Sequence, residues 1–167
     1  MSQFAFLKPE FAPIYEHAQR AEVLALSDPR GSCFYTRLAL ETAVKWLYQH
    51  DGTLRTPYDD ALSALIHEGT FRTLVGNALV TKARVVKDLG NRAVHDTRQV
   101  PPGDAAVALR ELFHFGYWLV RTYAKGAKPQ PENKRAAVKR PEVLKHRKPE
   151  EAEAGYQVPQ RHHFPRP

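Results

Sequence analysis

The chain has 167 residues, enough for one packed domain and an appended segment but too few for a motor protein or a large multidomain enzyme. Its formal net charge of +7 is uneven, because residues 1–124 carry 14 Lys and Arg against 13 Asp and Glu, whereas residues 125–167 carry 11 against 5. The single cysteine, Cys33, excludes an internal disulfide framework and any multi-cysteine metal site, and we interpret it as a small core residue.

Apolar residues at helical spacing, without sustained strand-like alternation, predict an all-α bundle of about five helices. The cap signals for these helices are Asp28 before Pro29, Thr56 before Pro57, and Asp104 after a proline-rich loop. The expected helices cover residues 10–26, 29–48, 57–66 and 79–95, with a last helix from 104 to 123 and residues 71–75 as a further turn or a short helix.

The helix expected over residues 79–95 has a polar face and an apolar stripe. At about 100° per residue, Asp88, Asn91 and His95 share one face with Arg84, whereas Gly90 lies in the stripe on the opposite side. Glycine costs about 1 kcal/mol relative to alanine inside a helix, so we expect the backbone of another helix to approach closely at Gly90. The simplest interpretation is a bundle helix with a tight crossing.

The same polar face offers the one candidate for chemistry. His95 has the intrinsic pKa range of a general acid or base, and Asn91 is placed to orient a phosphate or a ribose hydroxyl. A histidine at a helix C-terminus is also a common capping residue that complements the helix dipole. Phosphoryl chemistry needs a nearby cation, for which Arg92 is the closest choice and Arg84 lies nearly three turns away.

Arg37, Glu41 and Lys45 are spaced four apart in the second helix and allow two interpretations. One is a surface ladder of ion pairs along the helix, which we favour for Lys45. The other is a partly buried Glu41 that holds His95 or Asn91 across the bundle. In the last helix, Tyr117, Trp118 and Arg121 lie off the apolar seam and suggest a surface for a partner, unless the first helix covers them.

We expect no metal and no cofactor. The eight histidines are scattered apart from His162 and His163, and the glycine-rich loops that hold nucleotides are missing. Residues 125–167 hold 7 of the 13 prolines and predict a disordered, basic linker or tail with weak attraction for nucleic acid. Its Glu132-Asn133-Lys134 motif matches half of a nuclease pattern by chance. No segment approaches the roughly 20 apolar residues of a membrane span, so we expect a soluble, cytoplasmic protein.

Several short motifs occur in a fixed order between residues 4 and 124. They are Phe-Leu-x-Pro-Glu-Phe at residues 6–11, Ser27-Asp28-Pro29, Arg37 with Glu41 before Trp46-Leu47-Tyr48, Pro57-Tyr58-Asp59, Leu65-Ile66-His67-Glu68, Gly90-Asn91-x-Ala93-Val94-His95 and Tyr117-Trp118. This series resembles the N-terminal helical domain of type I restriction-enzyme R subunits, the domain of unknown function 4145 family, which is similar to the HEPN superfamily. The resemblance implies a HEPN-like bundle over residues 4–124 in a system that defends against foreign DNA.

The resemblance also bears on catalysis. Active HEPN ribonucleases carry an arginine that is separated from the histidine by four to six intervening residues, but Gly90, Leu89 and Asp88 hold those positions here. The expected function is therefore a non-catalytic interaction module that binds restriction subunits or nucleic acid. The alternative is a HEPN-like ribonuclease that uses His95 with Arg84 or Arg92 as a displaced arginine. The binding residues expected on either interpretation are Arg37, Glu41, Asn91, Arg92 and His95.

Bundles of this superfamily often pair, so a homodimer is one expectation. An R subunit continues with a nuclease domain and a helicase motor, and neither fits after residue 124. We expect a fragment of a longer subunit, a truncated relative or a stand-alone accessory protein.

Overall fold

The computed structural model describes residues 2–126, 128 and 129, and all regular secondary structure in this part of the chain is helical. The predicted all-α fold with five helices is confirmed. Most of the predicted tail, from residue 130 onward, lies outside the described residues. A short 3-10 turn precedes the helices. The elements are η1 (Ala5–Leu7), α1 (Ala12–Leu24), α2 (Pro29–His50), α3 (Leu62–His67), α4 (Gly69–His95) and α5 (Pro102–Tyr123).

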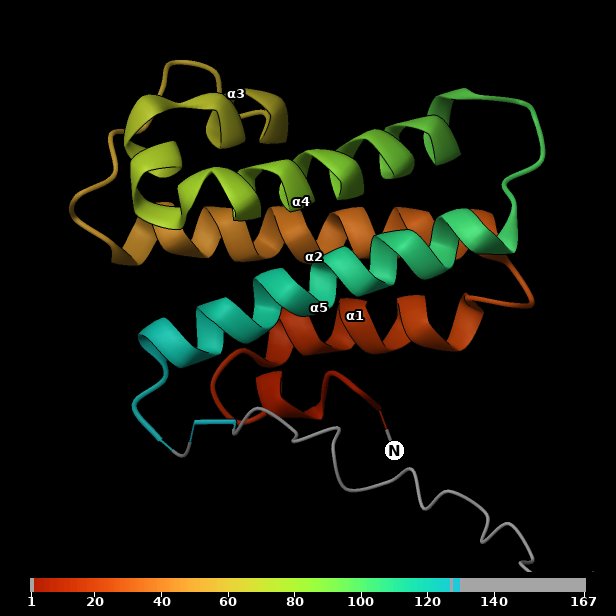
Figure 1. The fold of residues 1–167 in the computed structure, drawn as a ribbon, viewed down its shortest axis with the longest axis horizontal. Coiled ribbons are helices and arrows are strands. Elements are labelled where there is room, and N and C mark those ends of the chain that lie inside the picture. Colours follow the sequence, from red (N-terminus) through yellow and green to blue (C-terminus); the bar gives the residue numbers. More distant parts are fainter. Residues whose placement is uncertain (1, 127, 130–167) are drawn as a thin grey trace, which may run out of the picture. The chain divides into compact units, whose positions relative to one another are not determined.

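Four long helices lie side by side, and α2 is the central one, in contact with α1, α4 and α5 (Figure 1). This agrees with the wide apolar arc of its sequence. The core runs between these helices, where the rings of Phe71 and Phe115 stack at 6.5 Å between centroids. Cys33 is fully buried in a smaller cluster with Leu89 and Ala105, as its interpretation as a core residue predicts. No helix among the described residues has the length and apolar character to cross a membrane.

One of the three predicted caps is confirmed and two are wrong. The Asp28 carboxylate accepts a hydrogen bond from the Gly31 amide at 3.0 Å, and Pro29 begins α2. Residues 56–61 are not helical, because Asp59 instead forms a turn with the Ala61 amide at 2.8 Å, and α3 begins only at Leu62. The last helix begins earlier than expected: α5 starts at Pro102, and no side chain caps it. Proline suits this first helical position because its φ is already helical.

The two segments expected around residue 76 form one element with a break. Glu68 caps α4, and its carboxylate accepts hydrogen bonds from the Thr70 and Phe71 amides at 2.6 and 3.1 Å. Gly76 then has φ 77° and ψ 158°, a conformation that only glycine adopts readily, so the helix axis changes direction there. Residues 71–75 are therefore a short helical segment before the long one.

The chain before α1 and the chain after α5 lie together. The Glu10 carboxylate accepts hydrogen bonds from the backbone amides of Lys125 and Gly126 at 2.9 and 2.8 Å, and these bonds lower the pKa of Glu10. The hydroxyl of Tyr117 donates to the carbonyl oxygen of Pro129 at 3.2 Å. Hydrogen bonds thus join the first and last described segments of the bundle.

Candidate functional site

The predicted polar face of α4 borders an open hollow of about 480 Å³. Asp88, Asn91 and His95 lie side by side around it, as their helical spacing predicts. His95 is the last residue of α4 and is exposed, whereas Asn91 is half-buried. Arg84, which the sequence placed on the same face, is not among the lining residues. The complete lining is Asp88, Asn91, Arg92, His95, Asp96 and Thr97.

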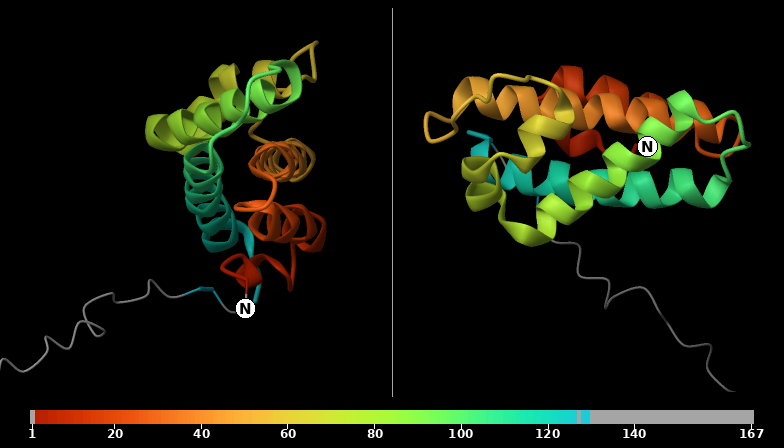
Figure 2. Two further views of the ribbon diagram at one scale, coloured as in Figure 1. Left: turned by 90° about the vertical axis from the view of Figure 1, so that its right-hand side faces the viewer. Right: turned by 90° about the horizontal axis from the view of Figure 1, so that it is seen from above.

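A second, smaller hollow of about 260 Å³ adjoins the first. It lies between the C-terminal end of α4, the loop that follows and the first turn of α5. These segments lie at the same end of the bundle as the loop between α1 and α2 (Figure 2). Arg92 and Asp96 line both hollows. The residues that line only the smaller one are Leu89, Arg98, Gln99, Val100, Pro101 and Asp104.

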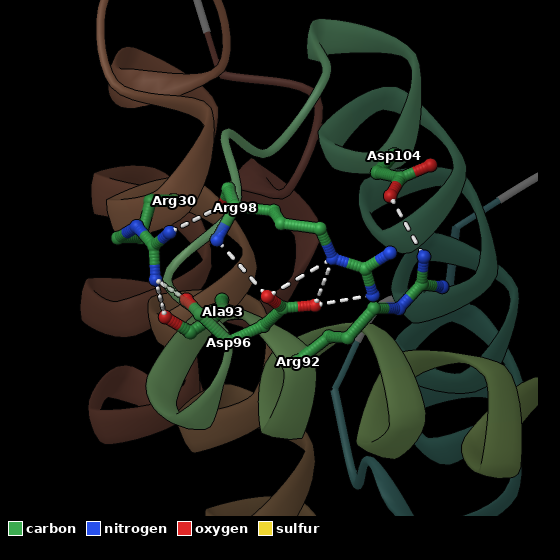
Figure 3. A network of polar contacts seen from close by, with 6 residues as sticks. All are labelled: Arg30, Arg92, Ala93, Asp96, Arg98 and Asp104. Carbon is green, nitrogen blue, oxygen red and sulfur yellow. Dashed lines mark hydrogen bonds and ion pairs between the residues drawn. The ribbon is translucent and has the colours of Figure 1, made fainter.

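Two carboxylates beside the hollows are already paired with cations. The Asp96 carboxylate accepts hydrogen bonds from Nε of Arg98 at 2.9 and 3.1 Å and from a terminal guanidinium nitrogen at 2.7 Å (Figure 3). These bonds lower the pKa of Asp96 to about 2, so it stays ionised and neutralised by Arg98. Asp88 has Lys87 as its partner at 2.7 Å.

Arg92 and His95 keep most of their hydrogen-bonding capacity. The Arg92 side chain is 55% exposed, and its contact with Asp104 is long, at 3.5 Å (Figure 3). Within the part of the chain that the structure describes, the imidazole of His95 has no hydrogen bond and no ion pair. With the carboxylates of Asp88 and Asp96 neutralised, the available donors favour a ligand that carries negative charge and acceptor oxygens.

Arg30 shapes this site, and the sequence analysis did not identify it. Its guanidinium donates hydrogen bonds to the carbonyl oxygens of Ala93 at 2.5 Å, Asp96 at 2.7 Å and Arg98 at 2.6 Å (Figure 3). These bonds hold the last turn of α4 and the loop that borders both hollows. A signal was available: a cation in the first turn of a helix is unfavourable for the helix dipole, so Arg30 needs a partner elsewhere.

The structure favours the ladder interpretation for the three charges of α2. Glu41 is bracketed by Arg37 at 3.4 Å and Lys45 at 3.0 Å. Among the described residues, neither a hydrogen bond nor an ion pair joins Glu41 to Asn91 or His95. Arg37 instead packs its aliphatic stem against Gly90, and its Nε is buried without a hydrogen-bond partner. The approach of a helix backbone predicted at Gly90 is therefore wrong, because the atoms nearest to Gly90 belong to the Arg37 side chain of α2.

The expected partner surface on α5 is partly covered. The Tyr117 ring packs against Phe6 and Phe113, with the guanidinium of Arg121 5.9 Å from its centroid. Trp118 is half-buried against the core, next to the rings of Phe115 and Tyr123. Tyr117 and Trp118 thus have different aromatic neighbours, and the covering elements are η1 and the core instead of the first helix.

In the described part of the chain, no group of three or more His, Cys, Asp or Glu side chains is arranged to hold a metal ion. The motifs at residues 132–134 and 162–163 lie outside the described residues. Cys33 is buried, and burial, followed by the charge of Asp104, raises the pKa of its thiol to about 11. A thiol in this state is a poor nucleophile at neutral pH.

Comparison with known families assigns most of the chain to one family. Residues 19–135 match the sequence profile described as Domain of unknown function (DUF4145). The chain belongs to this family. The matched range contains α2 to α5 and every residue that lines the two hollows, so the site lies within the DUF4145 domain. No curated protein and no solved structure matches the chain.

Proposed function

We propose that this DUF4145 domain is a non-catalytic binding module of a type I restriction-modification system in the cytoplasm, and that it contacts nucleic acid or a partner subunit through the larger hollow. The observation that carries the proposal is the gathering of Asn91, Arg92 and His95 around an open hollow whose neighbouring carboxylates are neutralised. The assignment to a restriction system rests on the ordered series of motifs described above.

The chemistry of the larger hollow favours nucleic acid over a neutral partner. The Arg92 guanidinium supplies a planar donor pair for a phosphate, and the Asn91 amide and the His95 imidazole add single donors beside it. Phosphate contacts of this kind position a protein on nucleic acid and make the affinity depend on salt. An acidic segment of a partner subunit offers the same charge, so both ligands belong in the test.

The surroundings of Gly90 support a non-catalytic role. An arginine at this position would complete the spacing to His95 that the resemblance associates with ribonuclease activity. In the structure, a Cβ atom at Gly90 would overlap with the stem of Arg37. The space needed for an arginine is therefore occupied, and the Arg37 guanidinium is directed to Glu41.

Binding is tested by titrating the full chain into labelled single-stranded and duplex oligonucleotides over a range of salt, together with pull-downs of restriction subunits. We expect saturable binding that weakens as salt rises and that Arg92→Gln reduces. Arg72→Gln, an exposed substitution in the first segment of α4, is the matched control. Absence of binding to oligonucleotides and to subunits alike would contradict the proposal.

A second candidate function is a HEPN-like ribonuclease with a displaced arginine. It is favoured by one observation, the presence of Arg92 beside His95 in the same hollow, whereas Arg84 is not part of that lining. The chain would then cleave RNA, and both His95→Ala and Arg92→Ala would abolish cleavage while Arg84→Ala would not. Equal RNA stability with wild type and His95→Ala would remove this candidate.

A further inference from the structure

The smaller hollow has a composition different from that of the larger one. We propose that it is a subsite for one unstacked nucleobase of a single-stranded nucleic acid, whose adjoining phosphate lies in the larger hollow. This inference rests on the proposed function and specifies its ligand.

The walls are suited to the flat faces of a base. Leu89 is buried and Val100 half-buried, both are apolar, and Pro101 adds a rigid ring at the start of α5. Leu89 belongs to the buried cluster that contains Cys33, and Val100 packs against this cluster. The hollow thus has an apolar floor fixed by the core, which an aromatic ring covers more favourably than water does.

The rim is suited to the edge of a base. Gln99 carries both a donor and an acceptor, and the Asp104 carboxylate is an acceptor whose contact with Arg92 is long. Bases are read through such combinations of donors and acceptors, while a simple anion site has no use for a carboxylate. The larger hollow presents free donors beside neutralised carboxylates, so the two hollows differ in the chemistry they select.

Arg92 connects the hollows. Its exposed guanidinium lines both of them, and among the described residues its one polar side-chain partner is Asp104, at a long distance (Figure 3). A guanidinium can stack on a base with its plane and donate to phosphate from its edge. A ligand that places a phosphate and a base on either side of Arg92 satisfies both hollows at once, and one nucleotide unit has this form.

The position of the smaller hollow selects unpaired strands. It is lined on three sides, by the end of α4, by the loop and by the first turn of α5. Arg30 holds the loop through the carbonyl oxygens of Asp96 and Arg98 and the end of α4 through that of Ala93. A base enters such a hollow only after it leaves its stack, which costs a few kcal/mol in a duplex and much less in a single strand. Prior fixation of the loop lowers the ordering cost of binding.

The test compares three labelled probes by fluorescence anisotropy with the full chain: a single-stranded oligonucleotide, the same strand made abasic throughout, and the corresponding duplex. We expect the intact single strand to bind about tenfold more tightly than the abasic strand. The duplex is expected to bind no better than the abasic strand. Val100→Trp, which fills the hollow, should bring the intact strand down to the abasic level and leave abasic binding unchanged.

Two further variants separate the subsites. Gln99 is exposed, so Gln99→Ala should not disturb folding. We expect this variant to lower the affinity for the intact strand alone. Arg92→Gln should weaken both single-stranded probes and reduce the slope of log affinity against log salt by about 0.7. Arg72→Gln is the control that should change neither measurement.

The outcomes distinguish this inference from the proposed function. Equal binding of the intact and abasic strands would overturn the base subsite and leave the module as a binder of phosphates. Preference for the duplex over the single strand would overturn it as well. If no probe binds but a restriction subunit does, the base subsite fails while the interaction module stands. Failure to bind any of these would overturn both.

Discussion

The guanidinium of Arg30 donates a hydrogen bond to the carbonyl oxygen of Ala93 at 2.5 Å, although the two residues are 63 positions apart in the chain. The same group holds the carbonyl oxygens of Asp96 and Arg98. A helix C-terminus leaves its last carbonyl groups without partners inside the helix, and here a side chain from the start of α2 supplies the donors. The end of α4 and the loop beside both hollows therefore depend on one arginine.

Replacement of Arg30 should loosen this region. We expect Arg30→Met to lower the free energy of unfolding by about 1–3 kcal/mol, the range for loss of charge-assisted hydrogen bonds, and to speed amide hydrogen exchange in residues 96–100. Arg30→Lys should restore only part of the loss, because an ammonium group lacks the planar fork. Urea unfolding and hydrogen exchange measure both effects. Unchanged exchange in that segment would show that other contacts hold the loop.

The contact between Gly90 and Arg37 gives a second prediction. Gly90→Ala places a methyl group where the Arg37 stem lies and should destabilise the bundle by about 1–3 kcal/mol through overpacking. Gly103→Ala, also in a helix but with no atom within 4 Å of the added group, should be neutral or stabilising by up to about 1 kcal/mol. Thermal unfolding of both variants is the measurement. If Gly90→Ala melted at the same temperature as wild type, the Arg37 side chain would move aside freely.

Acid should weaken the contact between helices α4 and α5, because it is made in part by the carboxylate of Glu111. Burial raises the pKa of Glu111, but hydrogen bonds from Lys82 at 2.7 Å, Arg110 and His114 outweigh this and lower it from 4.5 to about 2. Because the folded pKa lies below the unfolded one, the stabilisation is complete above pH 4.5 and is lost as the pH falls toward 2.

The matched variant for this pH dependence is Glu111→Gln. We expect it to be less stable than wild type by about 1–3 kcal/mol at neutral pH, with a difference that shrinks as the pH falls from 4.5 to about 2. Denaturant unfolding over this pH range gives the two curves. If the difference in the free energy of unfolding stayed constant down to the lowest pH, the contact between Lys82 and α5 would not depend on the charge of Glu111.

Cys33 provides a reporter of opening, because it is the single thiol of the chain. Its burial and raised pKa predict that iodoacetamide modifies it at neutral pH only through transient unfolding, far more slowly than a cysteine in a peptide. Mass spectrometry follows the modification over time, and added denaturant should accelerate it to the peptide rate. Rapid modification of the native protein would contradict the burial described here.

Much of the fold could be predicted from the sequence because its signals are local. Apolar spacing located the long helices, and Asp28 before Pro29 located the start of α2. The helix starts predicted at Thr56 and Asp104 were wrong. A short polar side chain can either cap a helix or close a turn, and the packing around it decides between the two. Asp59 closes a turn with Ala61, and Asp104 lies inside the first turn of α5 near Arg92.

The candidate site was predictable along one helix and not between helices. Asp88, Asn91 and His95 meet because their spacing on α4 requires it. The role of Arg30 and the second hollow depend on how α2, α4 and α5 cross, which no local pattern specifies. Glu41 shows the same limit, because both of its interpretations fit the spacing and only the crossing of the helices assigns it to Arg37 and Lys45.

The two amides that Glu10 binds have an architectural consequence. They bring the segment that enters α1 within hydrogen-bonding distance of the segment that leaves α5. A domain with adjacent entry and exit can be inserted into a surface loop of another polypeptide without straining either partner. The same proximity makes circular permutation feasible: a flexible linker from residue 126 to residue 2, which keeps the buried Phe4 and Leu7, with new ends opened in the exposed stretch around Tyr58, should give a bundle that still folds.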